Sequence, residues 1–142
     1  MKKLTPIEKI YEAWTAIADR RVKLNDRDAE VESSDGSKVY KVRFRDNFYS
    51  SDDNATYWQG YAGYPVIAVL MLQGKLPLDK EEAEKWKDIN WTELNKKHKN
   101  KYAEAVKEIE EERKINPETA KTAAEKVMNS LSEIDIVIKR KI

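Results

Sequence analysis

The longest unbroken apolar segment of the chain spans residues 61–74 and reads Tyr-Ala-Gly-Tyr-Pro-Val-Ile-Ala-Val-Leu-Met-Leu-Gln-Gly. It is too short to cross a bilayer and is apolar on every side, so it predicts a helix that is buried on every side. Pro65 suits the first turn of this helix, Gly74 suits its C-terminal cap, and Pro77 prevents its continuation. We expect the rest of the fold to be organised around this helix.

A second helix is predicted near the start of the chain. Apolar side chains recur there at the helical period, at Ile7, Ile10, Tyr11, Trp14, Ile17 and Ala18. Thr5 is expected to cap this helix, Pro6 to take its first position and Glu8 to complete a capping box. The apolar face predicts packing against the remainder of the protein.

The pattern changes to alternation between residues 22 and 51, which predicts β-strands. A short strand at 22–24 is followed by a segment in which Ala29, Val31 and Ser33 alternate with Glu30 and Glu32. Asp35-Gly36 stands between two alternating runs and predicts a two-residue hairpin turn, because both central residues then need positive φ.

The returning strand, residues 38–45, places alternate side chains on opposite faces. Tyr40, Val42 and Phe44 share one face, and the other carries Val39 with the basic residues Lys41, Arg43 and Arg45. Residues 48–51 predict a third strand, which completes an antiparallel meander.

Beyond Pro77 the pattern is helical. Asp79 with Glu82 predicts one capped helix, Asn90 with Glu93 predicts a longer one that continues through Ile109, and Asn116-Pro117 begins a third. Residues 134–139 alternate again and predict a last strand at an edge of the sheet; a helix continuing through residue 138 is the alternative. The basic residues 139–141 are expected to fray.

These elements predict an α+β protein. An N-terminal helix, a three-stranded antiparallel meander and a buried central helix form a unit at residues 1–76, and a helical extension at 77–142 packs on it. The two parts together are expected to form one compact domain.

The order of helix, short strand, hairpin with the sequence Val-x-Ser-Ser-x-Gly, third strand and Pro-Val-Ile-Ala-Val-Leu resembles the SWIM-type zinc finger domain over about residues 10–72. That family carries Cys-x-Cys after the third strand and Cys-x-His at the start of the helix. Here Tyr49 and Ser51 stand at the first pair, and Tyr64 and Val66 stand at the second. The resemblance therefore implies a form without zinc, in which Tyr49, Tyr64 and Val66 pack where a metal would join the two segments.

Composition narrows the functional classes. Lys and Arg number 27 against 26 Asp and Glu, so the net charge of +1 provides no global field toward nucleic acid or membrane. The chain has no cysteine, which excludes disulfides and thiolate chemistry and fits a cytoplasmic location. Residues 1–6 lack the apolar stretch of an export signal, and heavy Lys and Glu use is compatible with a thermophile.

Little in the sequence predicts catalysis. The acidic group Asp52-Asp53-Asn54 can bind a cation, but a solvated turn whose side chains cap backbone amides is the favoured interpretation. His98 is the only histidine and is expected to be a helix residue at the border of the core. A metal-assisted enzyme at Asp52, Asp53 and His98 is the least favoured hypothesis, and we expect no enzyme, no metal and no cofactor.

Binding is the favoured function. Aromatic rings that stack and basic residues that meet phosphates define a candidate surface, made of Lys41, Arg43, Arg45, Tyr57, Trp58 and Tyr61. The alternative is that the rings cover the end of the apolar helix while the basic residues pair with Glu30 and Glu32.

We therefore expect a small binding module. Its most favoured partner is another protein or a second copy of itself, met through the C-terminal helices or through an edge strand at residues 134–138. Nucleic acid, and DNA in particular, is the alternative partner. No membrane partner is expected.

Overall fold

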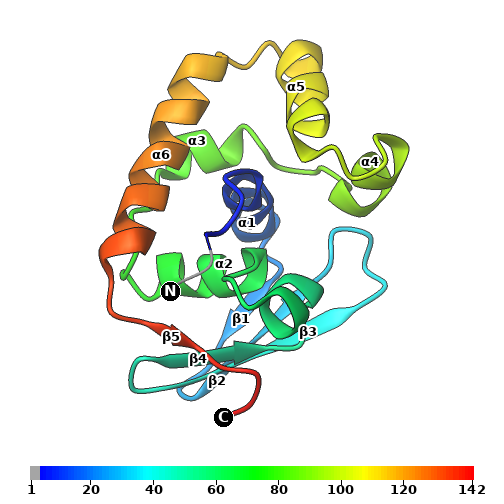
Figure 1. The fold of residues 1–142 in the computed structure, drawn as a ribbon. Coiled ribbons are helices and arrows are strands. Elements are labelled where there is room, and N and C mark those ends of the chain that lie inside the picture. Colours follow the sequence, from blue (N-terminus) through cyan, green and yellow to red (C-terminus); the bar gives the residue numbers. More distant parts are fainter. Residues whose placement is uncertain (1–3) are drawn as a thin grey trace.

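Helix α2 (Tyr64–Leu72) lies between the sheet and the other large helices in the computed structural model, which describes residues 4–142 (Figure 1). Its residues 65–71 are all buried, which confirms the predicted central helix. Pro65 lies in the first turn, and Gly74 follows the last turn with a φ of 77°, a left-handed conformation that favours glycine. Residues 1–3, part of the segment expected to lack an export signal, lie outside the described residues.

One sheet of mixed direction forms the base of the molecule (Figure 1). Its strands are β1 (Val22–Leu24), β2 (Asp28–Glu32), β3 (Val39–Arg45), β4 (Phe48–Ser51) and β5 (Val137–Ile138), and they lie in that order. The first four are antiparallel neighbours, whereas β5 runs parallel to β4. The predicted meander is confirmed, and β1 and β5 extend it on both sides. The α+β class is confirmed as well.

The turn between β2 and β3 differs from the prediction. Glu32 lies opposite Val39, and the Ser33 N–H donates to the Lys38 carbonyl at 2.9 Å, so the loop contains the four residues 34–37. Asp35 Oδ1 accepts from the Ser37 N–H at 2.9 Å, and Gly36 alone in this loop has a positive φ, of 75°. The two-residue turn was wrong because the side chain of Asp35 organises a wider loop.

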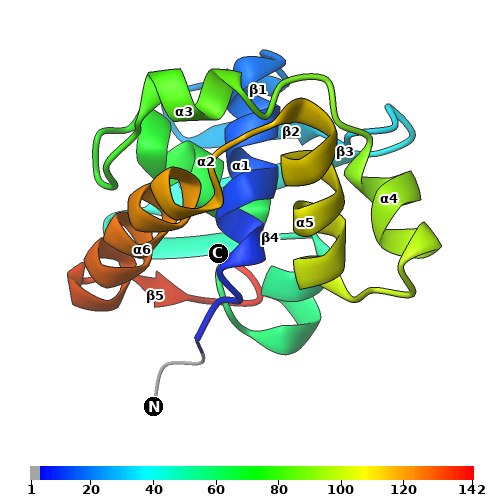
Figure 2. The same cartoon turned by 90° about the horizontal axis from the view of Figure 1, so that it is seen from above.

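Helix α1 (Glu8–Ala18) lies at the centre of the helical layer, which Figure 2 shows from above. It packs on α2 and is surrounded by α3 (Lys80–Glu84), α5 (Tyr102–Arg113) and α6 (Pro117–Glu133). All of these helices lie on the same side of the sheet (Figure 1). Among residues 4–142, no helix therefore lies against the opposite face of the sheet.

The predicted start of α1 was wrong. The helix begins at Glu8 after Ile7, and no side chain caps it. Thr5 Oγ1 instead donates to the carbonyl of Ala62 at 2.9 Å, which ties the N-terminal segment to the loop before α2. A tertiary hydrogen bond has replaced the local cap, and Pro6 precedes the helix.

An aromatic cluster joins α1 to the C-terminal half of the chain. The ring of Trp86 lies 4.7 Å from that of Tyr11 and 6.3 Å from that of Trp91, and Trp14 packs beside them. Trp91 Nε1 donates to Thr15 Oγ1 at 2.8 Å. Rings at these separations add specific contacts to a large apolar burial, so the helical extension shares one core with α1.

The long helix predicted from Asn90 is divided. Asn90 caps α4 (Trp91–Lys97) by accepting the Glu93 N–H at 3.1 Å, as predicted, but α5 starts separately at Tyr102. Lys99 and Asn100, with φ of 54° and 64°, turn the chain between the two helices. The caps predicted at Asp79 and Asn116 are confirmed by hydrogen bonds to the amides of α3 and α6.

The end of the chain forms the predicted edge strand. The Val137 N–H donates to Asn47 O and the Lys139 N–H donates to Tyr49 O, each at 2.8 Å. Ile136 is only 6% exposed. Lys139 is thus held in the sheet rather than frayed, contrary to expectation. Within residues 4–142, no helix has the length and apolar character that crossing a membrane requires.

The complete burial of α2 predicts a contrast between two of its leucines. Leu70 is 0% exposed and Leu72 is 39% exposed. Replacing Leu70 with alanine should lower the free energy of unfolding by about 2–5 kcal/mol, because it leaves a cavity in the core. The matched change Leu72→Ala should cost less than about 1 kcal/mol. Urea unfolding of both variants measures this, and equal losses would contradict the burial of α2.

Candidate functional site

The predicted basic residues lie on the helix-free face of the sheet. Lys41 stands opposite Glu30, Arg43 stands between Asp28 of β2 and Ser50 of β4, and Arg45 stands opposite Phe48. The structure therefore confirms that the three basic side chains alternate with the core-facing residues of β3.

Acidic residues neutralise only part of this row. Lys41 Nζ lies 3.4 Å from Asp28 Oδ2, and Asn25 together with Lys41 lowers the pKa of the Asp28 carboxyl. Glu32 lies opposite Val39 and not opposite a basic residue. Within residues 4–142, Arg43 and Arg45 form no ion pair. Lys41 lies opposite Glu30 as the alternative required, but its ion-pair partner is Asp28, so the predicted pairing with Glu30 and Glu32 was wrong.

The C-terminal segment adds two cations that the sequence analysis expected to fray. Lys139 Nζ lies 4.7 Å from the centre of the Phe48 ring, between β4 and β5. Arg45 stands directly opposite Phe48 in the β3–β4 pairing. We call Arg43, Arg45, Lys139 and Phe48 the basic face. The alternation at residues 134–139 was the available signal for the position of Lys139.

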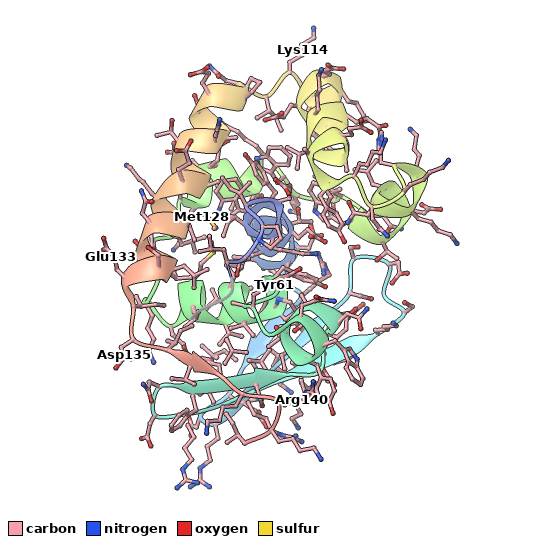
Figure 3. The ribbon with its side chains drawn as sticks, in the orientation of Figure 1. Tyr61, Lys114, Met128, Glu133, Asp135 and Arg140 are labelled. Carbon is pink, nitrogen blue, oxygen red and sulfur yellow. The ribbon has the colours of Figure 1, made fainter. Side chains whose placement is uncertain are left out.

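Arg140 meets the two rings of the short helix η1 (Ala55–Gln59). Its guanidinium lies 5.3 Å from the ring centres of both Tyr57 and Trp58, and its Nε donates to Tyr57 O at 3.4 Å. Trp58 is 64% exposed, so this cation–π group faces solvent. The structure thus gives Tyr57 and Trp58 a basic neighbour from the end of the chain, Arg140, whose position is labelled in Figure 3.

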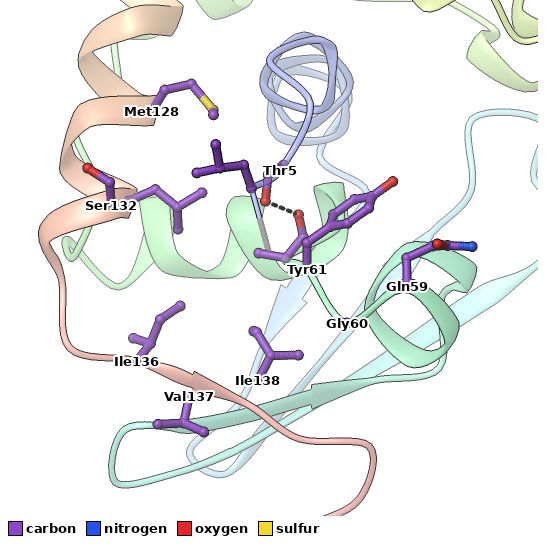
Figure 4. A pocket seen from close by; sticks show the side chains of 12 residues that line it. Thr5, Gln59, Gly60, Tyr61, Met128, Ser132, Ile136, Val137 and Ile138 are labelled. Atoms are coloured by element: carbon purple, nitrogen blue, oxygen red, sulfur yellow. Dashed lines mark hydrogen bonds between the residues drawn. The ribbon is translucent and has the colours of Figure 1, made fainter. Parts of the chain in front are cut away.

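Tyr61 lies apart from this group (Figure 3). Tyr61 lines an apolar cavity of about 640 Å³, which Figure 4 shows from close by. The cavity is also lined by Leu4, Met128, Leu131, Ile136 and Ile138. Burial raises the pKa of the Tyr61 hydroxyl, and the charge of Lys9 opposes this rise. The predicted six-residue surface therefore does not form as one group.

The four positions that resemble zinc-ligand positions lie in or beside the core. Tyr49, Ser51 and Val66 are at most 3% exposed. The centre of the Tyr49 ring lies 5.8 Å from that of Phe44, whereas the centre of the Tyr64 ring lies 6.2 Å from that of Tyr40. Tyr49 and Tyr64 thus each have a separate ring partner, and the SWIM resemblance stays a prediction.

His98 ends helix α4, at the border that the sequence predicted. Its Nε2 lies 3.0 Å from Glu108 Oε1 and its Nδ1 lies 3.8 Å from Glu104 Oε2. Among residues 4–142, no three His, Asp or Glu side chains group in a way that could hold a metal ion. The hypothesis that joined His98 with Asp52 and Asp53 at a metal is therefore not supported by their positions.

A polar cleft of about 290 Å³ lies between the β2–β3 loop, α1 and α4. Fifteen residues line it, from Lys9 to Tyr102; the charged and amide side chains among them are Lys9, Glu12, Arg21, Asp53, Asn54, Asn95 and Asn100. Ser34 of the loop and Thr92 of α4 close one wall, with hydroxyl oxygens 3.2 Å apart. Sequence reasoning missed this cleft because its side chains come from distant segments.

Two titratable side chains of α1, the half-buried Lys9 and the buried Glu12, form one side of the cleft. Lys9 Nζ lies 3.3 Å from Glu12 Oε2 and 4.5 Å from the centre of the Tyr102 ring. Burial raises the pKa of Glu12, and Lys9 opposes that rise. Burial alone would lower the pKa of Lys9, but Glu12 and Tyr102 outweigh it and raise the value.

The other side of the cleft is built on Asp53, which is 5% exposed. Its Oδ2 accepts the Thr56 N–H at 3.1 Å, and Thr56 Oγ1 in turn accepts the Gly63 N–H at 3.0 Å. The predicted capping of backbone amides is confirmed, but the solvated turn was wrong for Asp53. Gly63 is required, because a Cβ there would lie 2.1 Å from Asp53 Oδ2.

Several polar atoms of the cleft residues lack partners. Arg21 Nη2, Asp53 Oδ1 and Asn95 Oδ1 are buried and make no hydrogen bond with the described part of the chain. Asn95 Nδ2 lies at 3.5 Å from Glu12 Oε1, at the limit of a hydrogen bond. Unpaired buried groups cost about 1–3 kcal/mol each, so the residues that line this cleft lower the stability of the fold locally.

The fold and these surfaces define a small α+β protein with a helix-free basic face and a polar cleft. The chain belongs to the family described as uncharacterised conserved protein UCP014422, whose model matches residues 2–137. No curated protein matches the chain. No solved structure matches it either.

The position of Gly63 predicts strong coupling with Asp53. Asp53→Ala alone should destabilise the protein by about 1–2 kcal/mol through loss of a buried cap. The same change in a Gly63→Ala background should cost far less, because it also removes the clash, and a coupling energy above about 1 kcal/mol is expected. Gly60→Ala, where a Cβ meets nothing within 4 Å, is the control and should be additive with Asp53→Ala. Additivity at Gly63 would contradict this geometry.

The raised pKa of Glu12 predicts a pH dependence. A carboxyl that binds its proton more tightly in the folded state stabilises fully below its unfolded pKa of about 4.3, and this contribution is lost as pH rises through the folded value. The unfolding free energy of the natural protein should therefore fall relative to that of Glu12→Gln as pH rises from about 4 upward. Urea unfolding across this range tests it, with the exposed Glu133→Gln as control. If the natural protein instead gained stability relative to Glu12→Gln as pH rises, the pKa of Glu12 would not be raised in the folded state.

Proposed function

We propose that the chain is a small non-catalytic binding module, located in the cytoplasm, and that its basic face binds single-stranded nucleic acid. The observation that carries this proposal is the row of Arg45, Lys139 over the Phe48 ring, and Arg43. Arg43 and Arg45 form no ion pair with residues 4–142, although Arg43 stands opposite Asp28. Surfaces that bind single strands combine two elements: basic side chains that contact the phosphates, and aromatic rings on which the bases stack.

The group of Arg140, Tyr57 and Trp58 supports the same proposal. Trp58 is the most exposed ring in this part of the chain, and Arg140 lies against it at 5.3 Å. An exposed indole beside a guanidinium offers a stacking surface and a phosphate contact within one short segment. Because the net charge is only +1, binding rests on this local patch and not on a global field.

A protein partner is the second candidate. Exposed apolar side chains on or next to the helix-free face favour it, with Val39 59%, Trp58 64% and Val137 39% exposed. Self-association by addition of an edge strand at residues 134–138 has less support, because Ile136 is buried within its own fold and β5 has only two residues.

Titration with a fluorescent single-stranded DNA at low salt tests the first candidate. Binding should weaken with salt, and Arg43→Gln and Arg45→Gln should each reduce the slope of log K against log salt by roughly 0.7. Trp58→Ala should cost about 1–3 kcal/mol of binding free energy. Lys23→Gln, which lies on the same face at β1, is the matched control and should change little. A flat titration at low salt would remove this candidate.

Sedimentation at several protein concentrations tests self-association, the simplest form of the second candidate. A mass that rises with concentration, and falls back in Val137→Asp, is the result this candidate predicts, because a charge at an apolar contact is costly to bury. A monomer at every concentration would exclude self-association through this face.

A further inference from the structure

The apolar cavity beside α6 carries an inference that goes beyond the proposed function and does not depend on it. The cavity has a volume of about 640 Å³ and is lined by residues of α6, β5, the N-terminal segment and the loop before α2 (Figure 4). Its walls consist mainly of apolar side chains without rings, among them Leu4, Met128, Leu131, Ile136, Val137 and Ile138. Among residues 4–142, no charged side chain lines it. The part of an occupant that enters is therefore uncharged and aliphatic, because a buried charge would have no partner there.

The walls of the cavity are partly open to water. Leu4 is 78% exposed and Val137 is 39% exposed, and Met128, Leu131 and Ile138 are half-buried. Apolar side chains gathered around one hollow gain free energy when an apolar occupant removes them from water. The volume of about 640 Å³ lies within the range of about 300–1,000 Å³ that is typical of pockets for small molecules. The cavity thus fits a small apolar molecule.

The hydroxyl groups in the walls already donate to the chain itself. Thr5 Oγ1 donates to Ala62 O at 2.9 Å, the bond drawn in Figure 4, and Ser132 Oγ donates to Asn129 O at 2.7 Å. Gln59 supplies the remaining polar side chain of the lining, and it is exposed. Contacts inside the cavity are therefore mainly apolar, and a polar head group of the occupant is recognised outside it.

The charges around the cavity differ between its two ends. Glu133 and Asp135 lie at the connection from α6 to β5, and Figure 3 shows both of them on the opposite side from Arg140. Arg140 follows two residues after Ile138, and its Nε donates to Tyr57 O of η1 at 3.4 Å. The last residue of η1 lines the cavity, so Arg140 adjoins that end. An anionic head group is attracted to the Arg140 end and repelled from the acidic end.

Arg140 is held in place with donors to spare. The rings of Tyr57 and Trp58 each lie 5.3 Å from its guanidinium carbon. Within residues 4–142, its two Nη atoms make no hydrogen bond and it forms no ion pair. A guanidinium in this state offers the paired N–H groups that match the two oxygens of a carboxylate.

We propose that the apolar cavity binds a medium-chain fatty acid, with its unbranched chain inside the cavity and its carboxylate at the guanidinium of Arg140. The chain covers the partly exposed side chains of the walls, including Leu4 and Leu131. The carboxylate stays in water beside a cation, so no charge is buried.

A series of chain lengths tests the apolar part of the proposal. The probes are hexanoate, octanoate and decanoate, each titrated calorimetrically into the full chain below its micelle concentration. Each added methylene should tighten binding by about fourfold, as expected for a CH₂ group that leaves water. An affinity that does not rise with chain length would overturn the proposal.

A change of head group tests the position of the carboxylate. Arg140→Gln should weaken octanoate binding by about two- to fivefold, the size of an exposed ion pair, and should leave the affinity for uncharged 1-octanol unchanged. Lys139→Gln is the matched control and should alter neither affinity, because its side chain lies over the Phe48 ring. An equal effect of Arg140→Gln on both probes, or no effect on octanoate, would place the head group elsewhere and overturn the proposal.

Two further variants test the cavity itself. Leu131→Trp should abolish octanoate binding, because the indole occupies the cavity. Leu94→Trp is the matched control and should bind normally, since Leu94 is also half-buried but does not line the cavity. Leu4→Ala should weaken binding by about threefold or more through lost apolar contact. Leu4 is 78% exposed, so its variant keeps the test valid if Leu131→Trp does not fold.

Three other results would overturn the proposal. They are no binding of any of the three carboxylates, full octanoate binding by a folded Leu131→Trp, and cosedimentation with phosphatidylglycerol vesicles in place of binding to the free acids. Arg43→Gln and Arg45→Gln should bind octanoate as the natural protein does, because neither residue lines the cavity. Failure of the nucleic-acid proposal would therefore leave this test unaffected.

Discussion

A helix without a polar face can be stable in water only when other elements cover it on every side. Helix α2 imposes that constraint here: the sheet covers one side of it and α1 covers the other. Helix α1 is itself apolar enough to need cover, and the ring cluster of Tyr11, Trp14, Trp86 and Trp91 brings the C-terminal helices against it. The layered arrangement of the protein follows because α2 must be covered by the sheet and α1, and α1 in turn by the C-terminal helices.

The same constraint explains where the candidate sites lie. The chain must enter α2 through a tight loop, and Asp53, Thr56 and Gly63 hold that loop together by hydrogen bonds and close approach. This arrangement leaves Tyr57 and Trp58 on the outside, beside Arg140, and makes Asp53 part of the lining of the polar cleft. The helices all lie on one side of the sheet, so the basic face stays open to a partner (Figure 1).

Local chemistry was predictable from the sequence, and long-range contacts were not. The caps at Asp79, Asn90 and Asn116 form within a few residues, and all were predicted correctly. Thr5 has an equally good capping pattern, but its hydroxyl bonds to Ala62, far along the chain. The break between α4 and α5 had one signal, Asn100, since asparagine tolerates positive φ better than most residues.

In the candidate sites, too, the local features were predictable from the sequence and the long-range contacts were not. The alternation of β3 placed Arg43 and Arg45 correctly, because a strand's faces follow from a period of two. The neighbours Lys139 and Arg140 depend on the parallel pairing of β5 with β4, and Tyr61 lies elsewhere. The cleft collects Lys9, Asp53 and other side chains from six or more segments, and no local pattern contains that information.

The central claim is that these distant segments form a cleft whose lining residues carry buried polar atoms without a hydrogen-bond partner among residues 4–142. A high-resolution crystal structure with ordered solvent tests this claim most directly. We predict electron density for a ligand or for ordered water within hydrogen-bonding distance of Asp53 Oδ1 and Asn95 Oδ1. A cleft filled by protein side chains, with both oxygens bonded to donors of the chain itself, would contradict it.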